Sequence, residues 1–552
     1  MDCKFLMGAR RDWKYVEENG KDVWVCGWAE ADGALLDATD LAGMSCRALR
    51  EGKFDSLPLK LHGSFALACC RNGECLLVTD AVRSIPLFWR AGDGEVLAGD
   101  DPDLLCAREL PLDESSAEEF LAAGFVTGNA TLREGLRGVQ AGQHATISDD
   151  EVSLVDYYEY RCTYDDSRTE LELADEHDAV IMRAMERVVR STGGRQLVVP
   201  LSGGLDSRMV ASCLARLGRD NVLCYTYGLP GNAEARKSEE VAASLGLPWL
   251  HVEYDPHAVR TAMADEQYRE YRRFASSQVS SPHIDEWFAL QRLDSEGLVD
   301  KDAVFLPGHT GDFICGGHLK HLFDPAHNEN PHAFAEAMLR KHYSLWEDHV
   351  RKAPVRALLL SRLECAAGQG PLDSPEGLAA AYEFWEWRER QAKFIINAVR
   401  AYEWFGFDWR LPLWDRELME FWKGVPLGLK HEKYLYRLAL VRHDPFGVFA
   451  GEALAGPWDA QAALDRFRAR KRGVRRRLKR ALLGMPGVRC WAERRSRIRR
   501  LEKQYASHPL GIVRCWDRDE YVRRHIDKRH HQSLITLAQL EEERGPNNGS
   551  DT

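Results

Sequence analysis

A string rich in glycine and serine in the first half of the chain has the residue types that bind a nucleotide phosphate. It reads Ser202-Gly203-Gly204-Leu205-Asp206-Ser207. Two glycines let the backbone approach a phosphate closely, hydroxyls and the N–H groups of a following helix can bind its oxygens, and Asp206 can hold a magnesium ion. The string therefore predicts a phosphate and Mg²⁺ site, although a Gly-Gly pair also occurs in plain connections between a strand and a helix.

The elements around this string alternate between strand and helix, which would position it for ligand binding. The expected order is strand 196–201, helix 206–217, strand 222–227, helix 233–245 and strand 249–254. Gly218 and Gly246 follow the two helices, where glycine commonly ends a helix. Such an order is typical of a parallel sheet, and open parallel sheets bind ligands at the carboxyl ends of their strands. Leu201, at the end of the first strand, falls at that edge.

Composition and pattern divide the chain into three parts within an α/β fold class. Residues 1–160 contain short apolar runs bounded by glycine, asparagine or aspartate, which predict a sheet domain. Residues 170–460 hold the alternating region followed by helical, aromatic-rich patterns. Residues 461–552 form a basic segment with helical pattern. A chain of 552 residues is long enough for two or three domains, each with its own core.

Charge and segment composition exclude several classes of protein. The net charge of −11 argues against nucleic acid as the principal partner of the whole chain. We expect a cytoplasmic protein, because neither a secretory signal nor an apolar run of about 18 residues is present. The 14 cysteines lack a CxxC pair, so the sequence favours reduced, mostly buried thiols over a zinc site or a disulfide framework.

Three further motifs, together with the glycine-rich string, indicate a resemblance to a known family. The string resembles the pyrophosphatase loop (PP-loop) of enzymes that cleave ATP between its α and β phosphates. The segment from Phe305 to Gly317, which contains Asp312 and a Gly-Gly pair, looks like the second motif of asparagine synthetases. Trp409 to Asp415 and His431 to Arg437 resemble the later Arg-x-Pro-x-x-Asp motif and the lysine-containing helix of the same family. The four motifs stand in the family's order.

The resemblance implies an ATP-dependent ligase that adenylates a carboxylate, forms an amide with an amine or ammonia, and releases AMP and pyrophosphate. By that resemblance, residues 201–207 would hold ATP, Gly308 would lie near the adenosine, and Asp206 and Asp312 would bind Mg²⁺. Lys433 would stabilise charge late in the reaction. From the residues alone, Asp312 could instead cap a helix, and Lys433 could lie on a solvated helix face.

The N-terminal part resembles the αββα glutamine amidotransferase domain that precedes the synthetase in this family. His62 to Ala66, Asp80 to Trp89 and Ala141 to His144 carry that resemblance. Working members use a cysteine exposed at the amino terminus as the nucleophile. This chain begins Met1-Asp2-Cys3, so we expect a degenerate domain in which Cys3 is an ordinary thiol.

His309 occupies a position where asparagine synthetases have glutamate and β-lactam-forming relatives have tyrosine. A histidine there could take a proton from an attacking amine near neutral pH, or could only hydrogen-bond within its loop. If His309 is not the base, the sequence offers Glu383, Glu386 and Glu389 as alternatives. In either case the carboxylate substrate, a small molecule or a peptide, need not be aspartate.

The sequence is compatible with several functions. The chain could be a glutamine-hydrolysing asparagine synthetase, a β-lactam- or peptide-forming cyclase, or a nucleotide-binding scaffold without turnover. A homodimer is also possible. The basic segment from Arg466 to Lys503, with apolar residues such as Leu478 and Leu482, predicts contact with an anionic surface or a solvated helical face.

Overall fold

The computed structural model describes residues 2–457 almost continuously and the remainder of the chain in pieces. The gaps before residue 457 are 19, 72, 93, 106, 149–150, 320–321, 323–330, 367–371, 373 and 455. Beyond it the described residues are 495, 498–499, 501–503, 505, 518–526 and 532–542. Within these residues, no helix is both long and apolar enough to cross a lipid bilayer.

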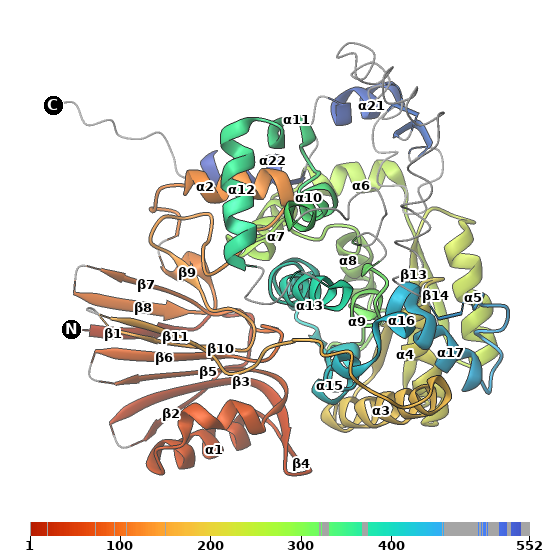
Figure 1. The fold of residues 1–552 in the computed structure, drawn as a ribbon, viewed down its shortest axis with the longest axis horizontal. Helices are drawn as coiled ribbons and strands as arrows, with labels where there is room; N and C mark the ends of the chain where they lie inside the picture. The colour runs from red at the N-terminus through yellow and green to blue at the C-terminus, as the bar shows by residue number, and fades with distance from the viewer. Residues whose placement is uncertain are drawn as a thin grey trace.

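Two stacked β-sheets form the N-terminal part (Figure 1). The larger sheet has the order β11 (Val152–Asp156), β10 (Gln143–Ile147), β6 (Glu74–Thr79), β5 (His62–Arg71), β3 (Lys21–Ala31) and β2 (Lys14–Glu18), with β4 (Ala34–Leu36) beside β3. The smaller sheet has the order β1 (Asp2–Leu6), β8 (Glu95–Gly99), β7 (Phe88–Gly92) and β9 (Arg137–Gly138). The predicted sheet domain is therefore present, with longer strands than the apolar runs indicated.

Because side chains alternate between the two faces of a strand, the larger sheet packs against two separate cores. Along β3, Trp24 and Cys26 face the core between the two sheets, whereas Val23 and Val25 face the outer layer. Helix α1 (Ala38–Arg50) covers that outer face and contributes Leu41 to it. α2 (Glu114–Ala123) is the second helix of this part.

A five-stranded parallel sheet lies at the centre of the second part. Its order is β14 (Trp249–Glu253), β13 (Val222–Gly228), β12 (Leu197–Pro200), β15 (Val304–Phe305) and β16 (Asp408–Trp409). α3 (Glu170–Ser191), α4 (Leu205–Arg216) and α5 (Ala233–Leu245) accompany the first three strands. The prediction of strand, helix, strand, helix, strand is confirmed. The strand order reverses between β12 and β15, which is where open α/β sheets form a ligand crevice.

The remainder of the described chain is helical, as the pattern beyond residue 330 predicted. The helices are α6 (Pro256–Met263), α7 (Glu266–Ser276), α8 (Trp287–Ser295), α9 (Gly311–Ile314), α10 (Pro331–His342), α11 (Glu347–Val350), α12 (Ala353–Ala366), α13 (Pro375–Trp385), α14 (Arg400–Trp404), α15 (Arg416–Gly424), α16 (Leu427–Lys430), α17 (Tyr434–Arg442), α21 (Arg518–Ile526) and α22 (Gln532–Glu542). Between α13 and α14 the chain forms a π-helix, η4 (Glu386–Ile395), and a 3₁₀-helix, η5 (Ile396–Val399). A π-helix of this length is uncommon, and such segments are frequent at functional sites.

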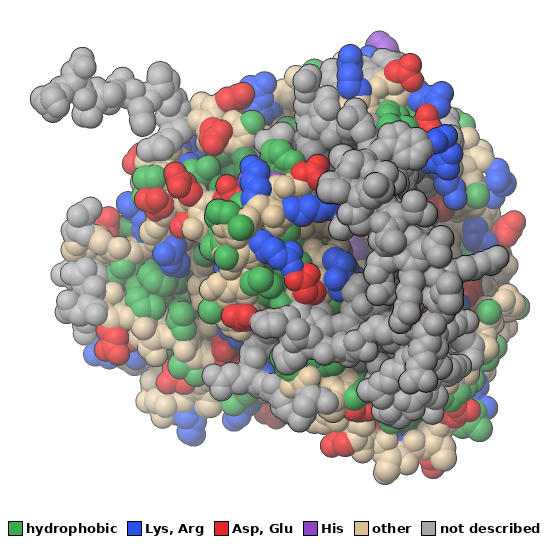
Figure 2. All heavy atoms as spheres, turned by 45° about the horizontal axis from the view of Figure 1, so that its top comes forward, with side chains coloured by type: hydrophobic (Ala, Val, Ile, Leu, Met, Phe, Trp, Pro, Cys, Tyr) green, Lys and Arg blue, Asp and Glu red, His purple; other side chains and the backbone are tan. Residues whose placement is uncertain are grey.

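The C-terminal helix α22 packs back onto the body of the protein. Leu537 and Leu540 join Phe120 of α2 in one apolar cluster, and the Arg133 guanidinium donates to the Leu540 carbonyl oxygen at 3.0 Å. α22 therefore touches both the N-terminal part and α7 of the second part. The basic segment predicted to contact an anionic surface lies almost wholly outside the described residues. On the described surface drawn in Figure 2, basic and acidic side chains are interspersed.

Candidate functional site

The predicted phosphate loop lies at the carboxyl end of β12, the central strand. The Ser202 N–H donates to Ser207 Oγ at 3.0 Å, and the Gly204 N–H donates to Ser202 Oγ at 3.2 Å. These two hydrogen bonds hold the loop in a compact conformation. Helix α4 then begins at Leu205, and no side chain caps its first turn. N–H groups at the start of a helix favour an anion there. The loop thus has the geometry that the sequence predicted.

Asp206, on the first turn of α4, has the properties of a metal ligand. One of its oxygens, Oδ1, is buried and has no hydrogen-bond partner. Burial raises the pKa of the carboxyl to about 6. Gly311 lies directly against it, because a Cβ at that residue would come within 2.2 Å of Asp206 Cγ. An orphaned carboxylate oxygen in a space kept open by glycine fits a hard cation such as Mg²⁺.

The loop after β15 brings the second predicted acid to the same place. Gly308 packs on the backbone of α4, where a Cβ would lie 2.6 Å from the Ser207 nitrogen. Thr310 then has a φ of 86°, a costly conformation for a β-branched residue, and Asp312 follows on α9. The Asp312 side chain is 61% exposed and pairs with Lys433. Its position beside Asp206 supports the metal-ligand expectation over a simple helix cap.

Lys433 reaches Asp312 because the chain before α17 is in an unusual conformation. Glu432 and Lys433 both have positive φ, 51° and 63°. The Lys433 side chain is only 16% exposed, so it does not lie on a solvated helix face. Burial by itself would lower the pKa of this ammonium, but Cys315, Asp206 and Asp312 outweigh that effect and raise it. The lysine is therefore held charged beside both acids.

His309 stands between Gly308 and the strained Thr310, next to the metal-ligand candidates. Its Nδ1 is buried without a hydrogen-bond partner. Burial, with a smaller contribution from His283, lowers the pKa of the imidazole to about 3. In this state the ring is neutral and a weak proton acceptor. The predicted role as a general base stays a prediction.

Two buried carboxylates from α13 and η4 border the same region. Glu383 pairs with the buried Lys430 at 2.7 Å and accepts a hydrogen bond from the Tyr164 hydroxyl at 2.6 Å. Glu386 is wholly buried and pairs with His318, with Arg390 at 3.3 Å. Lys430 did not emerge from the sequence, and the only signal was its position three residues before Lys433.

The charges around Glu386 also include Lys341, at 4.0 Å from the carboxylate. Burial alone would raise the pKa of Glu386, but the nearby His318 and Lys341 lower it well below its usual range. Its second oxygen, Oε2, has no hydrogen-bond partner. Thr310, in the loop of His309, lies 3.5 Å from Gln391 of the same π-helix. A charged, buried cluster therefore adjoins the loop that carries His309.

Comparison with known proteins accounts for this arrangement. The sequence profile of the asparagine synthase family matches residues 178–450, which contain the phosphate loop, Asp312 and Lys433. The chain belongs to the asparagine synthetase family. It is also 28% identical over 158 residues to the carboxyethyl-arginine beta-lactam-synthase of Streptomyces clavuligerus. That match covers 28% of this chain and 29% of the relative, less than a third of the relative's length.

The asparagine synthetase family is a family of ATP-dependent, amide-forming ligases. The structure brings three of the four family motifs together at the carboxyl ends of β12 and β15. In the fourth, Arg410-x-Pro-x-x-Asp415, the two charged residues make structural contacts. Asp415 caps α15 and pairs with Arg187 at 2.6 Å, and Arg410 is buried against Asp408 at 2.8 Å.

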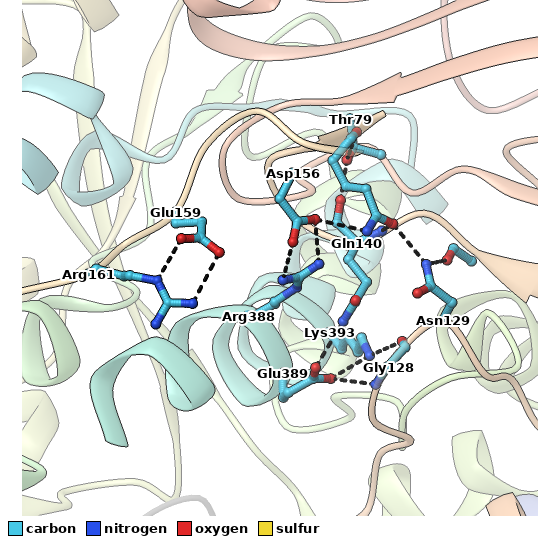
Figure 3. Close-up of polar contacts among 12 residues, drawn as sticks. Thr79, Gly128, Asn129, Gln140, Asp156, Glu159, Arg161, Arg388, Glu389 and Lys393 are labelled. Carbon is cyan, nitrogen blue, oxygen red and sulfur yellow. Dashed lines mark hydrogen bonds and ion pairs between the residues drawn. The ribbon is translucent and has the colours of Figure 1, made fainter. Parts of the chain in front are cut away.

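The π-helix joins the synthetase part to the N-terminal sandwich (Figure 3). Glu389 accepts hydrogen bonds from the Gly128 N–H at 2.9 Å and from Gln140 at 2.8 Å, and pairs with Lys393 at 2.5 Å. Arg388 makes a two-pronged pair with Asp156. Both oxygens of Glu389 are engaged in this interface, which weakens its candidacy as a base.

Proposed function

We propose that this protein binds Mg-ATP, activates a carboxylate as an acyl-adenylate, and joins the acyl group to an amine or ammonia with release of AMP and pyrophosphate. The observation that carries the proposal is the convergence of Asp206, Asp312 and Lys433 beside the phosphate loop. The second part of the fold then acts as a PP-loop synthetase domain, and the N-terminal sandwich as an amidotransferase-like domain without its nucleophile.

Each residue has a chemical task in this proposal. Residues 201–207 bind the phosphates through backbone N–H groups and the serine hydroxyls, and Gly308 lies where adenosine approaches. Asp206 and Asp312 would hold Mg²⁺, which when bound supplies charge stabilisation for the pyrophosphate leaving group. Because Lys433 pairs with Asp312, we assign its fixed positive charge to the same leaving group, an earlier step than the resemblance implies. His309 lines the approach to the acyl group.

The source of nitrogen follows from the position of Cys3. It lies within strand β1, opposite Val96, and clusters with Cys70 and Cys75 of the other sheet. Because the Cys3 sulfur lies within this cluster of thiols between the two sheets, we propose that it does not hydrolyse glutamine and that ammonia or an amine is the donor. A glutamine-hydrolysing reaction is the alternative, and glutamate release from glutamine that disappears in Cys3→Ala would establish it.

A second candidate is closure of an amide within one substrate, because the Streptomyces relative is named a beta-lactam-synthase and a β-lactam is a cyclic amide. The local match to that relative and the position of Cys3 favour it. The two candidates differ in their need for an added amine. If product forms from a single carboxylate substrate in ammonia-free buffer, the reaction is a cyclisation.

The proposal is tested by ATP–pyrophosphate exchange across a panel of carboxylates, with nucleotide products separated by chromatography. We expect exchange with a subset of carboxylates and formation of AMP. Asp312→Asn should abolish exchange, whereas Asp300→Asn, which alters an exposed carboxylate away from the site, should leave it unchanged. Formation of ADP and phosphate by the wild type would refute the proposal.

A further inference from the structure

Three cysteines far apart in the sequence meet in the N-terminal sandwich. Cys3 lies on β1 of the smaller sheet, and Cys70 and Cys75 lie on β5 and β6 of the larger sheet. The three sulfurs all lie within 4.8 Å of one another. β1 packs against both β5 and β6, so the cluster bridges the two sheets. None of the three belongs to the ATP site.

Cys70 and Cys75 face each other in the geometry from which a cross-strand disulfide forms. They are direct partners in the β5–β6 register, one pair before Arg71 and Glu74, which flank a two-residue hairpin connection. In such a hairpin the next pair outward is a non-hydrogen-bonded pair, whose side chains approach most closely. The two sulfurs lie 2.6 Å apart.

The third thiol gives access to this buried pair. Cys70 and Cys75 are 3% and 0% exposed, whereas Cys3 is partly exposed. A reagent from solution therefore meets Cys3 first. Cys69, the neighbour of Cys70, belongs to the opposite cluster beneath α1 because side chains alternate along a strand.

We propose that Cys70 and Cys75 form a reversible disulfide, reached through Cys3, when the protein meets a low-molecular-weight disulfide such as glutathione disulfide. Cys3 attacks one glutathione sulfur and releases the first glutathione thiol. Cys70 then attacks the Cys3 sulfur and releases the second, and Cys75 attacks the Cys70 sulfur and frees Cys3. Two protein thiols are oxidised, one glutathione disulfide is reduced to two thiols, and each attacking thiol's proton goes to a leaving thiolate.

Burial favours this product over a metal ion held by the same sulfurs. Burial raises the pKa of Cys75 well above its usual range, and hydrogen bonding to Cys3 together with burial does the same for Cys70. A metal would need both as thiolates in an apolar core, whereas a disulfide is uncharged. The inference is independent of the proposed ligase activity.

The experiment is a glutathione redox titration of the full-length protein, with acid quench, alkylation and tryptic mapping without reduction. Cleavage after Lys4, Lys60, Arg71 and Arg83 puts Cys3, Cys70 and Cys75 on three different peptides, 1–4, 61–71 and 72–83. We expect peptides 61–71 and 72–83 to become linked. The link should persist in Cys69→Ser, which removes the other cysteine of peptide 61–71.

A rate measurement tests the role of Cys3. Cys3→Ser should slow formation of the link by about tenfold or more, because glutathione disulfide loses its route to the buried thiols. The final oxidised fraction should stay within about twofold of wild type, because Cys70 and Cys75 themselves are unchanged. Cys365→Ser, at an exposed cysteine on α12, should change neither quantity. An unchanged rate in Cys3→Ser would overturn the relay. Absence of the link under glutathione disulfide, or stoichiometric zinc or copper protecting all three thiols, would overturn the proposal.

Discussion

Replacing Asp206 with asparagine should damage catalysis and stabilise the protein, and the structure gives the size of both effects. One buried oxygen of the Asp206 carboxylate has no hydrogen-bond partner, and Asp312 and Lys433 lie beside it. Its negative charge is therefore available to bind a cation. Charge stabilisation by a bound metal is worth several kcal/mol. Loss of about 3–5 kcal/mol corresponds to about 10²–10⁴-fold slower ATP–pyrophosphate exchange.

The stability effect follows from the pKa of Asp206, which burial raises from 3.8 to about 6. Between those pH values the folded protein binds more protons than the unfolded chain, so this group's contribution to stability falls as pH rises. Above pH 6 the buried charge costs about 3 kcal/mol. Asp206→Asn removes that cost, so we expect a gain of about 1–3 kcal/mol at pH 7.5 that shrinks toward pH 4.

Thermal unfolding with and without Mg-ATP measures both the change in stability and the loss of Mg-ATP binding. At pH 7.5 without nucleotide, Asp206→Asn should unfold at a higher temperature than wild type. Mg-ATP should raise the unfolding temperature of wild type and leave the variant almost unchanged, because ligand stabilisation requires binding. Asp300→Asn serves as the control. A variant that is less stable than wild type at pH 7.5, or that exchanges pyrophosphate at the wild-type rate, would refute the reasoning.

Three further predictions concern other residues of the site and the interface. His309→Ala should slow amide formation by about 10²–10⁴-fold and spare pyrophosphate exchange if the histidine is the base. Equal loss in both half-reactions would instead show that the histidine shapes the loop. Because its pKa is about 3, His309 should contribute no inflection near pH 6.5 to the kcat/KM profile in either case. Lys433→Met should slow exchange by about 10²-fold, with partial recovery in Lys433→Arg, and equal activity in both variants would count against a charge role. Lys393→Met should lower the free energy of unfolding by about 3–5 kcal/mol, because it leaves Glu389 buried without its partner, and a denaturant titration showing no change would contradict this.

The sequence alone predicted the place of the glycine-rich loop, between a strand and a helix, and the strands and helices around it. Short apolar strands, helices closed by Gly218 and Gly246, and the Ser-Gly-Gly string are local patterns, and local patterns determine local structure. The predicted helix 233–245 agrees with α5 at both ends. Asp206 and Asp312 could be selected because each stands in a short motif whose chemistry is independent of the surrounding fold.

Tertiary structure decided everything that depends on which segments meet. Lys433 was expected on a helix, yet two residues with positive φ place it before the helix and against Asp312. Lys430 became visible only through its buried pair with Glu383, and the three-cysteine cluster only through the stacking of two sheets. His309 illustrates the same limit for charge. Its residue type indicated a base near neutral pH. In the packed structure, burial lowers the pKa of the imidazole to about 3. Desolvation depends on every atom that excludes water from the ring, so the sequence pattern could not predict it.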